Sequence, residues 1–161
     1  MKRLRKLLLG TAVTAIAITG LIVGSTTPAQ ADTNNNSTRA RTICDNQAPG
    51  TGYYVLATAA VKLDSIHRGT LYLLYSSGSG YNCAVLLKDD YLTKTDHYTG
   101  VEIMNYTSSG GQGTLDYDYD AYQYYAGAVW VNGSDRCVSA KGQIGEGTNA
   151  ARGSIPKGFC S

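Results

Sequence analysis

From residue 44 onward, hydrophobic positions come in short runs rich in Tyr, Thr, Val and Leu, separated by segments rich in Gly and Ser. No extended apolar stripe with the helical period of 3.6 is present in this part of the sequence. Short runs of aromatic and β-branched residues bounded by turn residues are typical of β-strands. The expected strands cover residues 53–58, 70–75, 81–87, 101–106, 128–131 and 136–139.

The clearest local signal is a β-hairpin. The loop Ser-Ser-Gly-Ser-Gly at residues 76–80 separates two strand-length runs, and a Gly-containing loop of this length commonly joins antiparallel strands. In the second run, the period of two places four residues on one face: Tyr81, Cys83, Val85 and Leu87. We therefore expect Cys83 to be buried with its apolar neighbours.

Together these elements predict an all-β fold. Residues 44–161 suffice for one domain with one core, which we expect to be a single antiparallel β-sandwich or barrel of about six or seven short strands. Little helix is expected, although residues 59–66 or residues 89–95 could hold a short helical turn.

The N-terminal residues follow a different pattern. Basic residues at positions 2, 3, 5 and 6 precede an apolar run over residues 7–23, and Ala29-Gln30-Ala31 is a small-residue cleavage motif. This order is typical of a secretory signal peptide. We expect residues 1–31 to be cleaved, which leaves a secreted, extracellular protein without stable membrane insertion. An uncleaved membrane anchor is the alternative.

The segment after the cleavage motif is polar. Residues 32–42 contain no aromatic or large apolar side chain, so they cannot bury enough surface to offset the entropy of ordering. We expect residues 32–43 to form a flexible polar leader, followed by the β domain at residues 44–161.

The four cysteines predict two disulfides, because exported proteins meet an oxidising compartment. A zinc site is the alternative, but the cysteines lack the paired spacing of structural zinc motifs, and no metal is expected. Segments close in the chain are usually close in space. The preferred pairs are therefore Cys44 with Cys83 and Cys137 with Cys160.

Charge argues against nucleic-acid binding. Four of the 14 Lys and Arg residues lie in the signal, which leaves ten basic against 12 acidic residues in the exported part. A basic patch large enough to bind nucleic acid is therefore not expected.

An alternating segment, Asp-Tyr-Asp-Tyr-Asp at residues 116–120, suggests calcium at first sight. An EF-hand loop starting at Asp116 needs Gly at its sixth and Glu at its twelfth position, where this chain has Ala121 and Gly127. Strand alternation explains the pattern without a metal. It predicts a solvated acidic face with buried tyrosines.

Aromatic residues are dense around this segment, and exposed rings can stack on sugars or enter pockets of a protein partner. The candidate ligand-binding residues are Tyr117, Tyr119, Tyr122, Tyr124 and Trp130. The alternative is that these rings only supply apolar packing in a protein with a single Phe.

Catalytic residues are harder to identify. The chain has two histidines and no G-x-S-x-G motif. A small secreted hydrolase acting on RNA or polysaccharide could use His97, Glu102 and Arg68, whose side-chain types suit acid/base cleavage. A secreted protease inhibitor is a further alternative. No cofactor is expected.

Several segments resemble the spore-associated protein A family of small secreted bacterial proteins. They are Thr70-Leu71-Tyr72-Leu73-Leu74-Tyr75, Asn82-Cys83-Ala84-Val85, Tyr125-Ala126-Gly127-Ala128-Val129-Trp130-Val131, and Cys137-Val138 with Gly142 and Ile144. The resemblance implies a compact secreted domain associated with the spore or cell exterior, and it brings no catalytic residue.

The leading functional hypothesis is therefore a secreted, non-enzymatic protein of the spore or cell surface. It would act as a binding or structural module through its Tyr-rich face. The partner would be a component of the cell envelope or spore surface, either a glycan or a protein.

Overall fold

The computed structural model describes residues 31–160, with side chains from residue 36. The predicted signal peptide and cleavage motif therefore lie almost entirely outside the described residues. In chain order the elements are α1 (Ala31–Gln47), β1 (Tyr54–Leu63), β2 (Ile66–Ser76), β3 (Tyr81–Lys88), the 3-10 turn η1 (Asp90–Leu92), β4 (His97–Tyr106), β5 (Gln112–Tyr122), β6 (Tyr125–Asn132), β7 (Cys137–Ile144), the 3-10 turn η2 (Gly147–Asn149) and β8 (Ala151–Gly158).

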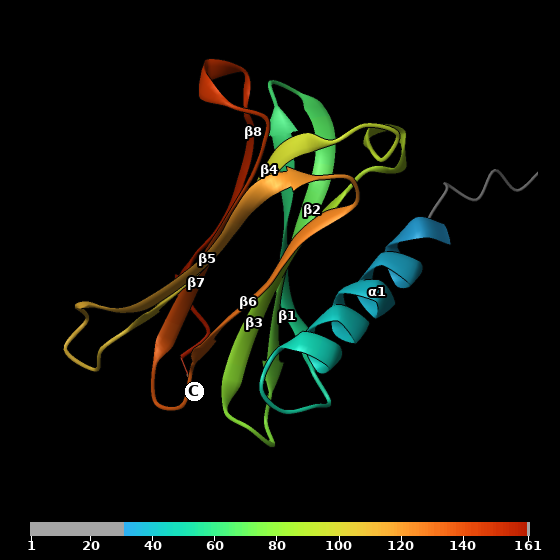
Figure 1. Cartoon of the computed structure of the whole chain (residues 1–161). Helices are drawn as coiled ribbons and strands as arrows, with labels where there is room; N and C mark the ends of the chain where they lie inside the picture. Colours follow the sequence, from blue (N-terminus) through green and yellow to red (C-terminus); the bar gives the residue numbers. More distant parts are fainter. Residues whose placement is uncertain (1–30, 161) are drawn as a thin grey trace, which may run out of the picture.

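The described strands form one antiparallel sheet in the order β5-β4-β7-β8-β1-β2-β3-β6. The sheet curls until its two edge strands, β5 and β6, lie beside each other, so the barrel is nearly closed (Figure 1). This confirms the all-β antiparallel prediction. The strand count is slightly higher than expected, because β5 and β8 are full strands of 11 and 8 residues.

The predicted hairpin is confirmed as β2 and β3. Its register is regular from Ser76 opposite Tyr81 to Gly69 opposite Lys88. The expected helical turn at residues 89–95 contains η1. The other expected turn, at residues 59–66, is wrong: most of this segment continues β1, which pairs with β2.

Both faces of β2 and β3 are covered. Leu71, Leu73 and Leu86 belong to the core inside the barrel. The side chains that alternate with these along the strands point to the outer face of the sheet. They include Cys83, and they belong to a second apolar cluster. The predicted face of Tyr81, Cys83, Val85 and Leu87 lies entirely in this second cluster.

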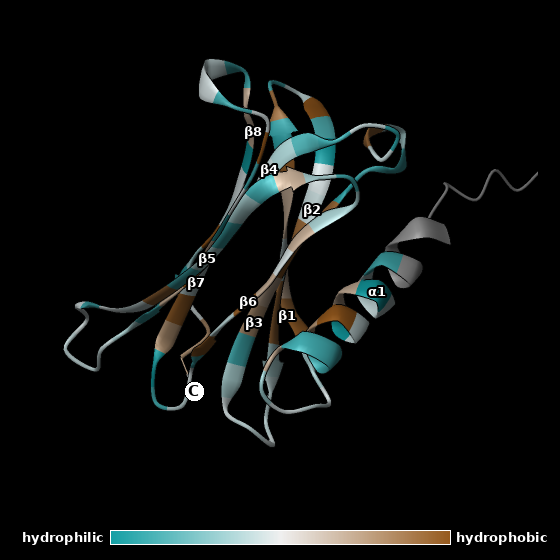
Figure 2. Ribbon diagram, viewed as in Figure 1, coloured by the Kyte–Doolittle hydropathy of each residue, from teal (hydrophilic) through white to brown (hydrophobic). Residues whose placement is uncertain are grey.

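Helix α1 covers the second cluster (Figure 1). Its buried residues Ala40, Ile43 and Cys44 recur with helical spacing, and Figure 2 shows hydrophobic residues on its C-terminal half. Residues 32–43, which the sequence analysis expects to form a flexible polar leader, thus lie within a helix in the structure. The helix needs only a narrow stripe of small apolar side chains, because the sheet beneath it supplies most of the apolar surface.

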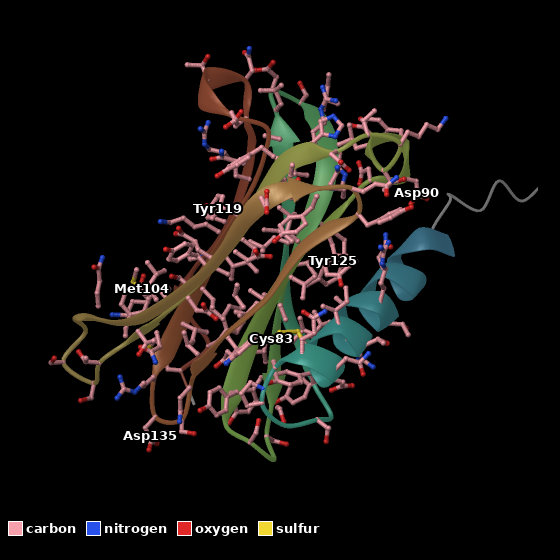
Figure 3. The ribbon with its side chains drawn as sticks, viewed as in Figure 1. Cys83, Asp90, Met104, Tyr119, Tyr125 and Asp135 are labelled. Carbon is pink, nitrogen blue, oxygen red and sulfur yellow. A yellow bond between two sulfur atoms is a disulfide. The ribbon has the colours of Figure 1, made fainter. Side chains whose placement is uncertain are left out.

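Two disulfides cross-link segments of the chain. Cys44 of α1 bonds Cys83 of β3, and Cys137 of β7 bonds Cys160 after β8. These are the pairs that proximity along the chain favoured. Figure 3 shows the Cys83 bridge between the sheet and α1, so this bond attaches the helix to the barrel.

Candidate functional site

Four neighbouring strands, β5, β4, β7 and β8, turn one face away from the barrel core. Their register aligns outward side chains in two rows across the sheet. One row contains Tyr117, Glu102, Lys141 and Ser154, and the next contains Tyr119, Gly100, Gln143 and Arg152. A hollow of about 500 Å³ lies over these rows. We call this surface the outer tyrosine face.

Three tyrosines form one end of the outer tyrosine face. The ring centroids of Tyr98 and Tyr119 lie 6.2 Å apart, and those of Tyr117 and Tyr119 lie 6.3 Å apart. Tyr117 is 64% exposed and Tyr98 40%. Figure 3 shows Tyr119 on the side of the sheet away from α1. The three rings therefore present a continuous aromatic surface to solvent.

Gly100 determines where the Tyr119 ring lies. These residues are direct cross-strand partners, and a Cβ at Gly100 would fall 1.9 Å from the Tyr119 ring. The ring therefore lies over the bare backbone of β4, which is possible only above glycine. Burial raises the pKa of the Tyr119 phenol, and the nearby Glu102 carboxylate adds to this effect.

Beside the rings lies an ion pair. Lys141 Nζ is 2.8 Å from Glu102 Oε1, and the hydrogen bond to this carboxylate raises the pKa of Lys141. Arg152 donates from Nη2 to the carbonyl of Gly147 at 2.8 Å. The hollow thus combines an aromatic wall with charged and polar hydrogen-bonding groups, a composition that suits a polar ligand with flat apolar faces.

The other predicted binding residues lie elsewhere. Tyr122 and Tyr124 line a separate hollow of about 230 Å³ at the β5–β6 turn. The Arg39 guanidinium lies 5.7 Å from the centroid of the Tyr124 ring. Trp130 packs against the cluster beneath α1. Of the five predicted residues, Tyr117 and Tyr119 are the pair on the outer tyrosine face.

The acidic segment has the opposite orientation to the one expected. Tyr117 faces solvent, whereas Asp116 and Asp118 are half-buried at the seam between β5 and β6. Asp118 Oδ2 accepts the backbone N–H of Gly127 at 2.7 Å, and Asp116 Oδ2 accepts that of Trp130 at 2.9 Å. The prediction of a solvated acidic face with buried tyrosines is wrong here, because these carboxylates satisfy the amides of the neighbouring edge strand.

The candidate hydrolase residues do not form one site. His97 and Arg68 line a hollow of about 160 Å³ at one end of the barrel. His97 Nδ1 lies 3.2 Å from Nζ of the buried Lys88. Glu102 lies on the outer face, paired with Lys141. His97 and Glu102 lie on opposite faces of β4, so they cannot act together as an acid/base pair.

The sequence analysis missed a different histidine pair. His67 Nδ1 lies 2.7 Å from Asp89 Oδ2, and His67 Nε2 lies 3.4 Å from Thr70 Oγ1. The register of the β2–β3 hairpin could have indicated this pair. Because Gly69 opposes Lys88, extending the pairing by one residue sets Arg68 opposite Asp89, beside His67.

Within the described residues, no group of three or more His, Cys, Asp or Glu side chains could hold a metal ion. The same part of the chain contains no helix that is long and apolar enough to span a bilayer.

Comparison with known proteins places the chain in a family. No family model matches the sequence, and no solved structure matches it. The sequence is similar to spore-associated protein A of Streptomyces coelicolor, with 32% identity over 136 residues. The alignment covers 84% of this chain and 79% of that relative. With this identity over most of both proteins, the chain belongs to the spore-associated protein A family.

Proposed function

We propose that this protein is a secreted component of the spore or cell surface that binds an envelope glycan through its outer tyrosine face. Its relative is named as spore-associated, which supports the location. The two disulfides fit an extracellular compartment.

The observation that carries the binding role is the composition of the outer tyrosine face. Tyr119 lines a hollow that also contains Glu102, Gln143 and Arg152. The exposed rings of Tyr98 and Tyr117 lie beside the Tyr119 ring. Sugar rings present apolar C–H faces and polar edges, so aromatic faces next to hydrogen-bonding side chains complement them. Monomeric proteins rarely leave clustered apolar side chains exposed without a binding role.

Binding to intact spores tests the proposal. Purified protein should sediment with spores, and the double variant Tyr98→Ser/Tyr117→Ser should bind at least about tenfold more weakly, because it removes the two exposed rings of this face. Tyr54→Ser is the matched control, since Tyr54 is 43% exposed but lies on β1.

Three results would contradict the proposal. The double variant could bind as well as the unaltered protein, or the protein could remain free in the culture medium and fail to adhere to spores. Binding that disappears after protease treatment of the spores, but survives enzymatic removal of surface polysaccharide, would show that the partner is a protein and not a glycan.

A further inference from the structure

A second site lies on the outer side of β2, close to the N-terminal half of α1. It is a hollow of about 370 Å³ whose lining includes Asn36, Thr58, His67, Thr70 and Asp89. In Figure 3 the label of the adjacent Asp90 marks this end of the sheet, beside α1. None of these residues belongs to the outer tyrosine face.

Inside this hollow the Asp89 carboxylate, the His67 imidazole and the Thr70 hydroxyl lie in a row, with the imidazole between the other two groups. Asp89 Oδ2 is 2.7 Å from His67 Nδ1, so the carboxylate accepts a hydrogen bond from the Nδ1–H tautomer. In the neutral imidazole Nε2 is then the hydrogen-bond acceptor, and Nε2 lies 3.4 Å from Thr70 Oγ1. A hydroxyl, a base and a group that orients the base are the three parts of an activated nucleophile.

Hydrogen bonds to the backbone around His67 hold this residue in place. Tyr91 donates its phenol hydrogen to the carbonyl of His67 at 2.6 Å, and the N–H of Asp89 donates to the carbonyl of Arg68 at 3.0 Å. His67 and Asp89 are therefore fixed on neighbouring strand ends, with side-chain exposures of 41% and 28%. The imidazole is both anchored and accessible to a small molecule.

We propose that Thr70, His67 and Asp89 form a nucleophilic site that cleaves short-chain acyl esters. Thr70 Oγ attacks the acyl carbon while its proton passes to His67 Nε2. The ester C–O bond then breaks, and the alcohol leaves with the proton held by His67. Water, with His67 as base, next attacks the acyl-Thr70 ester, which releases the carboxylic acid and restores the Thr70 hydroxyl.

The hollow suits such a substrate. Val55 and Tyr72 supply apolar wall for a short acyl chain, and Asn36 on α1 carries an amide able to donate to the developing oxyanion. Asp89 acts as a positioning residue, because it contacts the imidazole and not the substrate. Thr70 and His67 are the catalytic residues.

Covalent trapping of purified protein tests the proposal. Incubation with p-nitrophenyl acetate or a fluorophosphonate should attach one acyl or phosphonyl group, and peptide mapping by mass spectrometry should locate it on Thr70. Labelling should disappear in Thr70→Val, persist in Thr70→Ser, and fall at least about 100-fold in rate in His67→Ala, because the base is lost. Asp89→Asn should retain the hydroxyl and slow labelling.

Controls separate this site from simple imidazole chemistry, because any accessible histidine can hydrolyse an activated ester. His97→Ala should retain Thr70 labelling, because His97 lies outside this hollow. Ester hydrolysis that persists in Thr70→Val, or the absence of an adduct on Thr70 in folded protein, would overturn the proposal. Spore binding by Thr70→Val should be unchanged, so this test and that of the outer tyrosine face succeed or fail separately.

Discussion

At the scale of single residues, the phenol of Tyr122 shows how the seam alters an ionisable group. It donates a hydrogen bond to Asp118 Oδ1 at 2.5 Å. This bond, with a smaller effect of burial, raises the pKa of Tyr122 from 10.0 to about 12. Folding therefore favours the protonated phenol. The resulting stabilisation is complete below pH 10 and is lost as the pH rises from 10 to 12.

This linkage predicts the behaviour of Tyr122→Phe. Below pH 10 the variant should be less stable than the unaltered protein by about 1 kcal/mol, a value reduced for the partial exposure of the pair. Between pH 10 and 12 the difference should shrink, because the unaltered protein loses this contribution. Urea unfolding at several pH values measures it. Tyr117→Phe, on the outer face of the same strand, is the control, and a pH-independent difference for Tyr122→Phe would contradict the assignment.

At the scale of elements, local pattern and chain proximity were enough for part of the fold. The β2–β3 hairpin follows from its loop and its alternation, and both disulfides join segments close in the chain. Helix α1 could not be recognised in this way. Its own residues bury little surface, and its stability comes from a sheet face that only tertiary folding creates.

The orientation of β5 was also beyond local reasoning. Its alternation was visible, but either face could have pointed inward. The choice depends on β6, whose amides need acceptors across the seam. The outer tyrosine face has the same origin, because the registers of four strands place Tyr119 beside Lys141 and Arg152. Such pairings follow from strand order, which the sequence does not display.

The Cys44–Cys83 disulfide should stabilise the attachment of α1 to the barrel. The double variant Cys44→Ala/Cys83→Ala should lose about 3–4 kcal/mol of stability, because the disulfide no longer restricts the unfolded chain. Since the barrel core contains no α1 residue, β4 and β7 should keep their amide protection in hydrogen exchange, while α1 loses it. Cys137→Ala/Cys160→Ala is the control that should leave α1 protected. Loss of protection throughout the sheet would show that α1 and the barrel fold as one unit.

At the scale of the whole molecule, the described strands close into a barrel with no backbone ladder between the two edge strands, β5 and β6. Instead, three backbone amides of β6 donate to side chains: Asp118 accepts from Gly127, Gln47 of α1 accepts from Ala128, and Asp116 accepts from Trp130. Unpaired edge strands invite association with other chains. These side chains therefore both close the barrel and cover an edge that would otherwise recruit another strand.

Replacing the seam carboxylates tests this account of closure. Asp116→Ala and Asp118→Ala should each lower the free energy of unfolding by about 1.5–3 kcal/mol, because each leaves a backbone amide without its charged acceptor. The seam should loosen, which exposes Trp130, the one tryptophan of the chain, and shifts its fluorescence to longer wavelength. Asp120→Ala is the matched control, since Asp120 is exposed and its carboxylate accepts from the adjacent Ala121 N–H, not from β6. Opening of the seam should also increase concentration-dependent association through the bare edges of β5 and β6. If both seam variants match Asp120→Ala in stability, fluorescence and association, the carboxylates do not close the barrel, and packing of the inner side chains alone must hold β5 against β6.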